Sequence, residues 1–462
     1  MISGARMLED VARLSDPTYN GRQTGTADDA RSGMWVAERF AELGLQPLGP
    51  PPSDSPLRGW AMTDRVSTRL IDPTPTLEFQ IDARPLLARV REDYVPILDS
   101  PSVNVTAPIV FVGYGISDPA RNFDEYAGMD VRDRVVLFLR GKPDRYAPFV
   151  TQSEKERVAR EKGAVAFLTV TGPILNAYES RKGLGGRPLA LYSQAPDDHP
   201  LPGAWISTEL AEAIFPSLVP RGQASFREIQ EQLNHMAPRS AATSLIVRVA
   251  WESREVKGTM HNVVASLPGV DTSAEDTIIL GAHRDHFGRQ AGLLFPGADD
   301  NGSGTAVLLE VARALAQSGS RPARSILFIS FSGEEQGLLG SRLYVRQPVR
   351  PLKRSLAMIN VDHAGAGNGR LNVGVTDLSQ GLARQAAERA GLGEKIDLFG
   401  FFPGGDHVPF KEAGVPTITV VSGGVHPHFH QPSDTANAVS PDILAAAARY
   451  VLSLVWVLAQ GS

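Results

Sequence analysis

The feature that most restricts the fold is a series of short apolar segments in the second half of the chain. Continuous apolar runs occur at residues 262–267, 277–280, 326–331, 356–361 and 417–421. Stretches with helical spacing, such as residues 303–317, lie between them. Strands that are apolar on both faces are typical of a largely parallel sheet covered by helices on both sides. We therefore predict an α/β fold with a mostly parallel central sheet flanked by helices.

The middle of the chain has a different pattern of apolar and charged residues. Strand-like runs at residues 109–114, 134–139 and 164–170 surround a charged helical stretch at 154–162. No clustered histidine or acid occurs in the glycine-rich and proline-rich stretch at 172–202. We therefore predict three segments: residues 1–91 begin the main domain, residues 92–250 form a smaller β-rich α+β insert without catalytic groups, and residues 251–462 complete the main domain.

Composition excludes several classes of partner and metal site. The 462 residues include 46 Lys and Arg and 51 Asp and Glu, a net charge of -5, and no basic run marks a nucleic-acid surface. There is no cysteine, so any metal must be held by histidines and carboxylates. The longest apolar run, Tyr450 to Ala459, is too short to cross a bilayer. We expect no nucleic-acid partner and no membrane span.

Localisation and assembly have weaker signals. The first twenty residues lack the apolar core of a signal peptide. We expect an exported protein, periplasmic or extracellular, whose signal is absent from this sequence, with the cytoplasm as the alternative. The oligomeric state is unknown, because no sequence pattern addresses it.

Histidines and carboxylates gather where the predicted strands end. In an open α/β sheet, ligands bind beyond the carboxyl ends of the strands, so these ends share one rim. The relevant segments are residues 281–288, 296–304, 332–337, 362–363 and 426–434. Nitrogen and oxygen ligands without sulfur suit zinc, with manganese or cobalt as substitutes, and a carboxylate-rich set indicates two ions that share a bridging carboxylate.

Two adjacent acids, Glu334 and Glu335, indicate a division of labour. One carboxylate can ligate a metal while its neighbour acts as general base to a bridging water. An acid pair taken alone is more often a helix cap or a solvated surface, so the argument depends on the order and spacing of all five segments. No HExxH and no GxSxG motif occurs, which argues against a thermolysin-like protease and a serine hydrolase.

These segments resemble the motifs of the dinuclear-zinc peptidases of family M28, which include bacterial leucyl aminopeptidases, glutamate carboxypeptidase and the metal-free transferrin receptor ectodomain. The motifs are Gly281-Ala-His-Arg-Asp-His, Ala298-Asp-Asp-Asn-Gly-Ser-Gly, Phe331-Ser-Gly-Glu-Glu-Gln-Gly, Asn360-Val-Asp and Phe429-His-Gln-Pro-Ser-Asp-Thr. The resemblance implies a zinc exopeptidase fold with five metal ligands: His283, Asp300, Glu335, Asp362 and His430. It also implies that Asp300 bridges both ions and precedes a cis peptide, that Glu334 is the general base, and that Asp285 orients His283.

Two further regions resemble parts of the same family. Residues 110–116, 124–130 and 135–143 of the insert are similar to the protease-associated domain, which in relatives caps or flanks the active site. Gly405-Asp-His-Val-Pro-Phe is similar to a segment near the substrate pocket. Many relatives have tyrosine where this chain has Phe429, and that hydroxyl helps to polarise the scissile carbonyl. The candidate substrate-binding residues are therefore Asp406, His407, His428 and Phe429, with His428 as a substitute donor.

The function implied is removal of N-terminal residues from peptides that have a free α-amine. A glutamate-releasing carboxypeptidase is a rival hypothesis, for which Arg284 is a candidate contact to substrate carboxylates. Another amidohydrolase on the same scaffold and a catalytically weak peptide-binding module also stay open. His363 and His426 are candidates for contacts within or behind the ligand set. Phe399, Phe401 and Phe402 are candidates for an apolar pocket, although aromatic clusters more often belong to a core.

Overall fold

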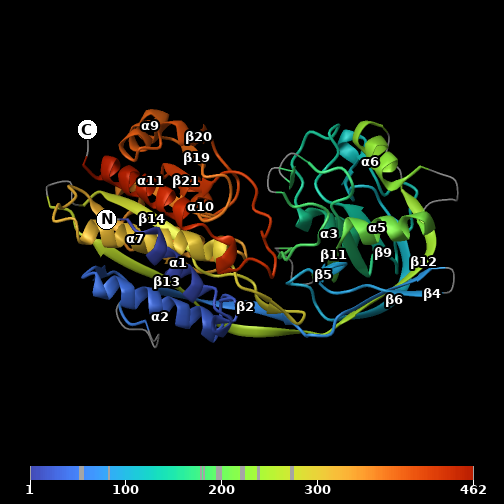
Figure 1. Ribbon diagram of the computed structural model, residues 1–462. Helices are drawn as coiled ribbons and strands as arrows, with labels where there is room; N and C mark the ends of the chain where they lie inside the picture. The colour runs from blue at the N-terminus through green and yellow to red at the C-terminus, as the bar shows by residue number, and fades with distance from the viewer. Residues whose placement is uncertain are drawn as a thin grey trace. The chain divides into compact units, whose positions relative to one another are not determined.

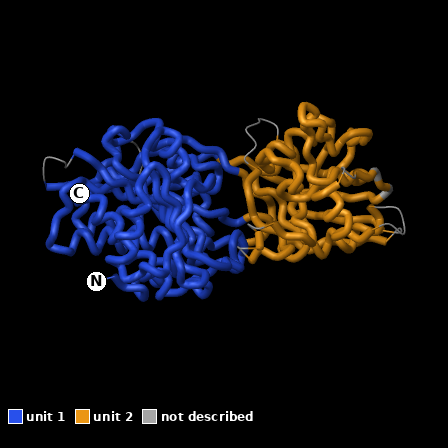
Figure 2. The backbone as a smooth tube through the Cα atoms, turned by 90° about the horizontal axis from the view of Figure 1, so that it is seen from above, with its two compact units in different colours: residues 1–68, 257–289, 294–462 blue, residues 69–256, 290–293 orange. Residues whose placement is uncertain are grey.

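The computed structural model describes residues 2–50, 57–81, 84–176, 179–180, 183–193, 200–218, 224–236, 240–270 and 275–460 (Figure 1). The chain forms two compact units (Figure 2). Unit 1 comprises residues 1–68, 257–289 and 294–462, and unit 2 comprises residues 69–256 and 290–293.

Unit 1 is built on a nine-stranded sheet with a parallel centre. The strand order is β1 (Gln46–Pro47), β13 (Ser253–Leu267), β17 (Ser325–Phe331), β14 (Thr277–His283), β18 (Ser355–Val361), β21 (Thr417–Ser422), β19 (Leu371–Thr376) and β20 (Ile396–Phe399), and β2 (Ala61–Ile71) pairs with β13. Strands β17, β14, β18 and β21 pair in parallel, whereas β13 and β19 join them in antiparallel fashion. The predicted α/β fold with a mostly parallel central sheet is confirmed.

Helices cover both faces of this sheet. The helices concerned are α1 (Gly4–Leu14), α2 (Ala27–Glu42), α7 (Gly304–Ala316), α8 (Leu339–Arg346), α9 (Gln380–Arg389), α10 (His407–Glu412) and α11 (Pro441–Gln460). Successive residues of β14 point to opposite faces. Ile278 and Leu280 join the core under α7 and α11, whereas Ile279 joins the core under α8 and α10. Burial on both faces explains why the strands are continuously apolar.

The last helix, α11, is apolar and largely internal. By length and composition alone it could cross a membrane, and 56% of its most apolar window is buried. It contacts α1, α7 and α9 (Figure 1), and Leu444, Val451 and Leu454 are fully buried in the unit 1 core. These contacts fit a core helix. The absence of a membrane span stays a prediction.

Unit 2 has its own eight-stranded sheet and core. The order is β4 (Arg84–Leu87), β3 (Thr76–Ile81), β12 (Ala241–Trp251), β6 (Val103–Phe111), β9 (Val135–Leu139), β10 (Ala166–Val170), β11 (Gly203–Ile206) and β5 (Tyr94–Pro96). Helices α3 (Gln152–Glu161), α5 (Thr208–Ile214) and α6 (Phe226–His235) accompany it. Residues 69–91 fall in this unit rather than with the main domain, because β3 pairs with β12 and β4. The assignment of the insert to the protease-associated class stays a prediction.

Helix α3 carries a buried carboxylate. Glu156 is 2% exposed; its Oε1 accepts from the Leu201 amide at 2.7 Å and its Oε2 accepts from the Ser193 hydroxyl. Burial raises the pKa of Glu156 to about 7, and these two hydrogen bonds lower it only in part. The native state therefore holds a proton that the unfolded chain releases at lower pH.

This proton predicts a pH dependence of stability. Because the pKa of Glu156 is higher in the native state, the contribution of this group to the free energy of unfolding falls as pH rises from about 5 to about 8. We expect Glu156→Gln to remove roughly 3 kcal/mol of that decline, measured by urea unfolding across this range. The control is Glu161→Gln, an exposed acid on the same helix. Identical pH profiles for the two variants would contradict the assignment.

Candidate metal centre

The five predicted ligands come together at the carboxyl ends of the parallel strands of unit 1. His283 ends β14, Asp362 directly follows β18, and Glu335 follows β17. Asp300 lies in the turn before α7, and His430 lies in the loop after β21. The sheet therefore brings to one rim five residues that are far apart in the sequence.

Asp300 lies between two pairs of ligands. Its Oδ1 is 3.4 Å from His283 Nε2, which is also 3.4 Å from Asp362 Oδ1. Its Oδ2 is 3.1 Å from His430 Nε2, which is 3.7 Å from Glu335 Oε2. One carboxylate thus presents a separate oxygen to each pair, which is the arrangement that two adjacent cations require.

The turn that carries Asp300 is tightly packed. Gly297 has φ +60°, and a Cβ there would lie 2.3 Å from the Asp300 carbonyl oxygen and 2.5 Å from the His286 ring. Only glycine fits this position. The Asp300–Asn301 peptide is cis, as the resemblance implied. The amides of Asp299 and Asp300 donate to the two carboxylate oxygens of Asp434, at 2.9 and 3.1 Å.

The electrostatics of the cluster favour a bound cation. Although burial lowers it, the nearby Glu334, Asp285 and Asp362 raise the pKa of His283 well above its usual value. Asp362 Oδ1 is buried and has no hydrogen-bond partner among the described residues. These nitrogen and oxygen donors fit zinc.

Glu334 and Glu335 occupy different environments. Glu335 is 8% exposed, whereas Glu334 is only partly buried. A carboxylate oxygen of Glu334 lies within 4.8 Å of the potential metal-binding atoms of His283 and Asp362. Burial, together with the charges of Asp362 and Asp406, raises the pKa of Glu334 well above its usual range. A carboxylate whose pKa is raised, next to candidate metal ligands, is suited to accept and release a proton.

Asp285 supports the opposite side of His283. The Nδ1 atom of His283 is 3.2 Å from the Asp285 carbonyl oxygen and 3.6 Å from its Oδ1, while Nε2 faces Asp300. Asp285 also accepts from the Thr24 hydroxyl at 3.0 Å and from the Glu334 amide at 3.3 Å. Both the predicted ligand and the predicted base are therefore connected to this one carboxylate.

Behind the predicted ligands lies a second group of contacts, of which sequence reasoning named His426 as a candidate and missed His286, Asp299 and Asp434. His286 Nδ1 lies 2.6 Å from Glu335 Oε1, and Asp434 holds the turn that carries Asp300. His426 Nδ1 lies 2.6 Å from Asp299 Oδ2. The motifs quoted above contain His286, Asp299 and Asp434. His426 lies three residues before the start of the last motif. No local pattern assigns their partners, because each partner lies on a distant segment.

The candidate substrate-binding residues differ in their surroundings. Asp406 is fully buried, and burial raises its pKa to about 7. His407 Nε2 is 2.9 Å from the Phe402 carbonyl oxygen, and His428 Nδ1 is 2.9 Å from Ser433 Oγ. Phe429 stacks on the ligand His430 with ring centroids 3.7 Å apart. Among these four residues, Phe429 contacts a predicted ligand. The substrate-binding roles of all four stay predictions.

The side chain of Arg284 is fully buried in unit 1. It is 0% exposed; its side chain pairs with Asp29 at 2.7 Å and donates to Ser32 and to the backbone carbonyls of His261, Ser330 and Phe331. These contacts use its donors within α2, β13 and β17. The contact with a substrate carboxylate that the carboxypeptidase hypothesis requires therefore has no support at this residue.

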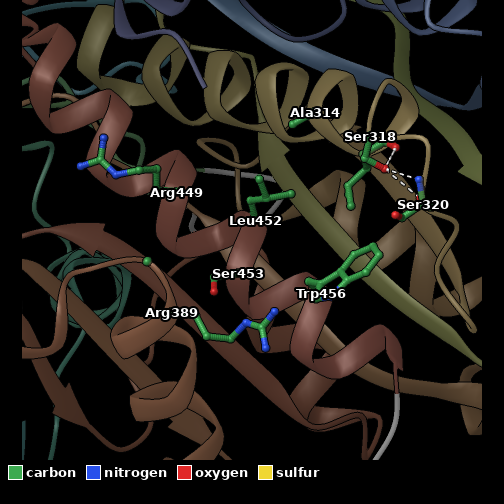
Figure 3. Close-up of a pocket in the computed structure, with 10 residues that line it drawn as sticks. Ala314, Ser318, Ser320, Arg389, Arg449, Leu452, Ser453 and Trp456 are labelled. Atoms are coloured by element: carbon green, nitrogen blue, oxygen red, sulfur yellow. Dashed lines mark hydrogen bonds between the residues drawn. The ribbon is translucent and has the colours of Figure 1, made fainter. Parts of the chain in front are cut away.

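A cavity of about 430 Å³ lies at another part of unit 1 (Figure 3). Its lining includes Arg389, Arg449, Leu452 and Trp456. None of the predicted ligands lines it, and its lining contains no histidine or carboxylate. This cavity therefore lacks the groups that the predicted chemistry needs.

Unit 1 is thus an α/β domain with a cluster of candidate metal ligands at one rim of its sheet. The sequence profile described as Peptidase family M28 matches residues 262–455. The chain is 34% identical over 213 residues to the aminopeptidase YwaD of Bacillus subtilis, covering 43% of this chain and 44% of that protein. It is 30% identical over 221 residues to a probable leucine aminopeptidase of Arthroderma otae, covering 45% and 60%. The alignments thus span about half the length of these relatives.

Solved structures share the fold over the whole chain. An aminopeptidase from Aneurinibacillus superimposes with a TM-score of 0.69 at 22% identity, covering 100% of this chain and 95% of that one. A zinc aminopeptidase from Bacillus subtilis superimposes with a TM-score of 0.65 at 22% identity, covering 100% and 96%. The predicted zinc exopeptidase fold is confirmed.

The buried ion pair between Arg284 and Asp29 is predicted to stabilise the end of β14, where the predicted ligand His283 lies. We expect Arg284→Met to destabilise unit 1 by roughly 3–5 kcal/mol, because Asp29 would remain buried without its partner. The measurement is guanidinium unfolding of the full chain. The control is Arg342→Met, which removes an exposed pair with Glu412 and should cost less than about 1 kcal/mol. Equal losses in the two variants would show that the buried pair has no special role.

Proposed function

We propose that the protein is a two-zinc aminopeptidase that removes N-terminal residues from peptides. The observation that carries this proposal is the position of Asp300, whose two oxygens face His283 and His430 separately. His283, Asp300 and Asp362 would hold one ion, and Asp300, Glu335 and His430 would hold the other. Manganese or cobalt would fit the same donors.

Zinc bound in this cluster would supply an acidified water and an electrophile for the peptide carbonyl. Glu334 would take a proton from the attacking water, because it lies beside His283 and Asp362 and its pKa is raised. The same carboxyl then returns the proton to the leaving amine. Asp285 keeps His283 in the orientation that points Nε2 toward Asp300.

Two exposed aromatic side chains beside His407 would suit an apolar substrate side chain. Phe401 and Phe402 are 43% and 41% exposed, so the expectation that they belong to a core is wrong for these two residues. They precede His407, and the Phe401 ring lies 5.9 Å from the His407 ring. Exposed aromatic residues beside a buried polar cluster are typical of a pocket for apolar groups. Leucine is therefore the first side chain to test.

The proposed activity predicts a specific substrate requirement. We expect the zinc-loaded protein to cleave leucine p-nitroanilide but not its N-acetylated form, because the free α-amine is part of what an aminopeptidase binds. Chelation should abolish the cleavage, and added zinc should restore it. Cleavage of the acetylated substrate, or no zinc-dependent cleavage at all, would contradict an aminopeptidase. Export to the periplasm or the medium remains part of the proposal and is tested separately by fractionation.

The base assignment predicts a separable loss. We expect Glu334→Gln to retain the wild-type zinc content but to lose on the order of 10²-fold or more in kcat, because the proton acceptor is gone. Zinc content and steady-state kinetics are the measurements. The control is Glu388→Gln, an exposed position on α9. Full activity of Glu334→Gln would remove Glu334 from the role of base, and loss of zinc would make it a ligand.

A further inference from the structure

His363 directly faces the ligand cluster from the position after Asp362. Its Nε2 lies 3.6 Å from Asp300 Oδ2 and 3.8 Å from Asp362 Oδ1. Its ring lies 5.1 Å from the ring of Phe429. The imidazole therefore stands between the proposed bridging carboxylate and the phenyl ring that lacks a polar atom.

The backbone holds His363 in an unusual conformation. Its φ is +45°, a left-handed value that non-glycine residues adopt rarely and often at functional sites. Its carbonyl oxygen accepts from the Ser422 amide at 2.9 Å and from the Ser422 hydroxyl. β18 and β21 are neighbours in the sheet, so two central strands fix this turn. The side chain is thus directed at the cluster by the fold.

Asp299 supports the other side of the imidazole. Its Oδ2 lies 3.7 Å from His363 Nδ1, and its Oδ1 accepts from the Gly365 amide at 2.8 Å. His426 holds the same carboxylate at 2.6 Å. The cavity beside these residues has only about 10 Å³, room for one water at most. His363 therefore has little space in which to swing away from the cluster.

We propose that His363 is a catalytic hydrogen-bond donor, whose Nε2–H binds the substrate carbonyl oxygen as negative charge develops on it. This inference rests on the proposed function. The need for such a donor arises at Phe429, whose side chain cannot donate, and a donor aimed at a developing oxyanion stabilises the transition state more than the ground state. His363 acts only as a hydrogen-bond donor, and Glu334 carries the proton that is transferred.

His428, the donor expected from the sequence, is less well placed. Its Nδ1 is engaged by Ser433 at 2.9 Å, and its neighbour Phe429, not His428, is the residue that contacts His363 and His430. A different role for His363 is also testable, because its donor atom lies within 4.8 Å of those of Asp300 and Asp362 and could ligate a metal. Zinc content distinguishes a ligand from a donor to substrate.

The test compares His363→Ala, His363→Gln and the double variant His363→Ala/Phe429→Tyr in the full-length protein, with the exposed His235→Ala as control. The measurements are zinc content, kcat and KM for leucine p-nitroanilide, and the Kd of the boronic acid analogue of leucine. We expect all variants to bind the wild-type amount of zinc. His363→Ala should lose on the order of 10²-fold in kcat with a smaller change in KM, and should bind the boronic acid more weakly.

The other two variants make the expectation specific to hydrogen bonding. Glutamine places an amide donor near the position of Nε2, so His363→Gln should retain more kcat than His363→Ala. The tyrosine hydroxyl at position 429 should restore at least about 10-fold of the lost kcat in the double variant. A merely structural role for His363 would give no such recovery.

The outcomes separate this inference from the proposed function. Zinc loss in the His363 variants, or unchanged kcat and boronic acid affinity, would each overturn the role of His363 while leaving the aminopeptidase intact. If the wild-type protein shows no zinc-dependent cleavage, the proposed function fails. Boronic acid binding by the wild-type and variant proteins then decides the His363 contact, and equal affinities overturn it.

Discussion

The site depends on one carboxylate, Asp300, and on what holds it in place. Asp300 is 3% exposed, and both of its oxygens face histidine nitrogens within 3.4 Å. A buried carboxylate is costly unless it is paired, and here its surroundings supply the pairing. Although burial raises it, His363 and His430 hold the pKa of Asp300 well below its usual range. The remaining ligands are arranged about an anion that stays ionised.

The parallel sheet makes this arrangement possible. Its central strands all end at the same rim, so His283, Asp362 and Glu335 reach Asp300 without long loops. Apolar residues on both faces of β14 keep the strand rigid between two helical layers. Arg284, one residue beyond β14, then connects this rim to α2 through Asp29. Precise placement of polar groups therefore follows from an apolar framework.

The sequence predicted the central sheet, which is confirmed, and five ligands, whose roles stay predictions, because both have strong local signals. Continuous apolar runs mark the buried strands, and each ligand stands directly in a short motif. It did not predict the placement of β3 in unit 2, because β3 pairs with β12, far along the chain. For the same reason it did not assign His286 to Glu335 or Asp434 to the Asp300 turn. Such pairings are set by the tertiary fold and leave no periodic pattern.

His363 and His426, whose roles the sequence left ambiguous, both contact the carboxylate of Asp299. Asp299 is placed next to Asp300 in the chain but faces away from the ligand pairs, toward His363 and His426. Although burial raises it, the neighbouring imidazoles of His363 and His426 hold the pKa of Asp299 below its usual value. One acid of the Asp299–Asp300 doublet is thus a proposed ligand, and the other lies against an imidazole beside it. We propose the same division at Glu334 and Glu335, so that each acidic doublet would combine a ligand with a residue that acts on protons or hydrogen bonds.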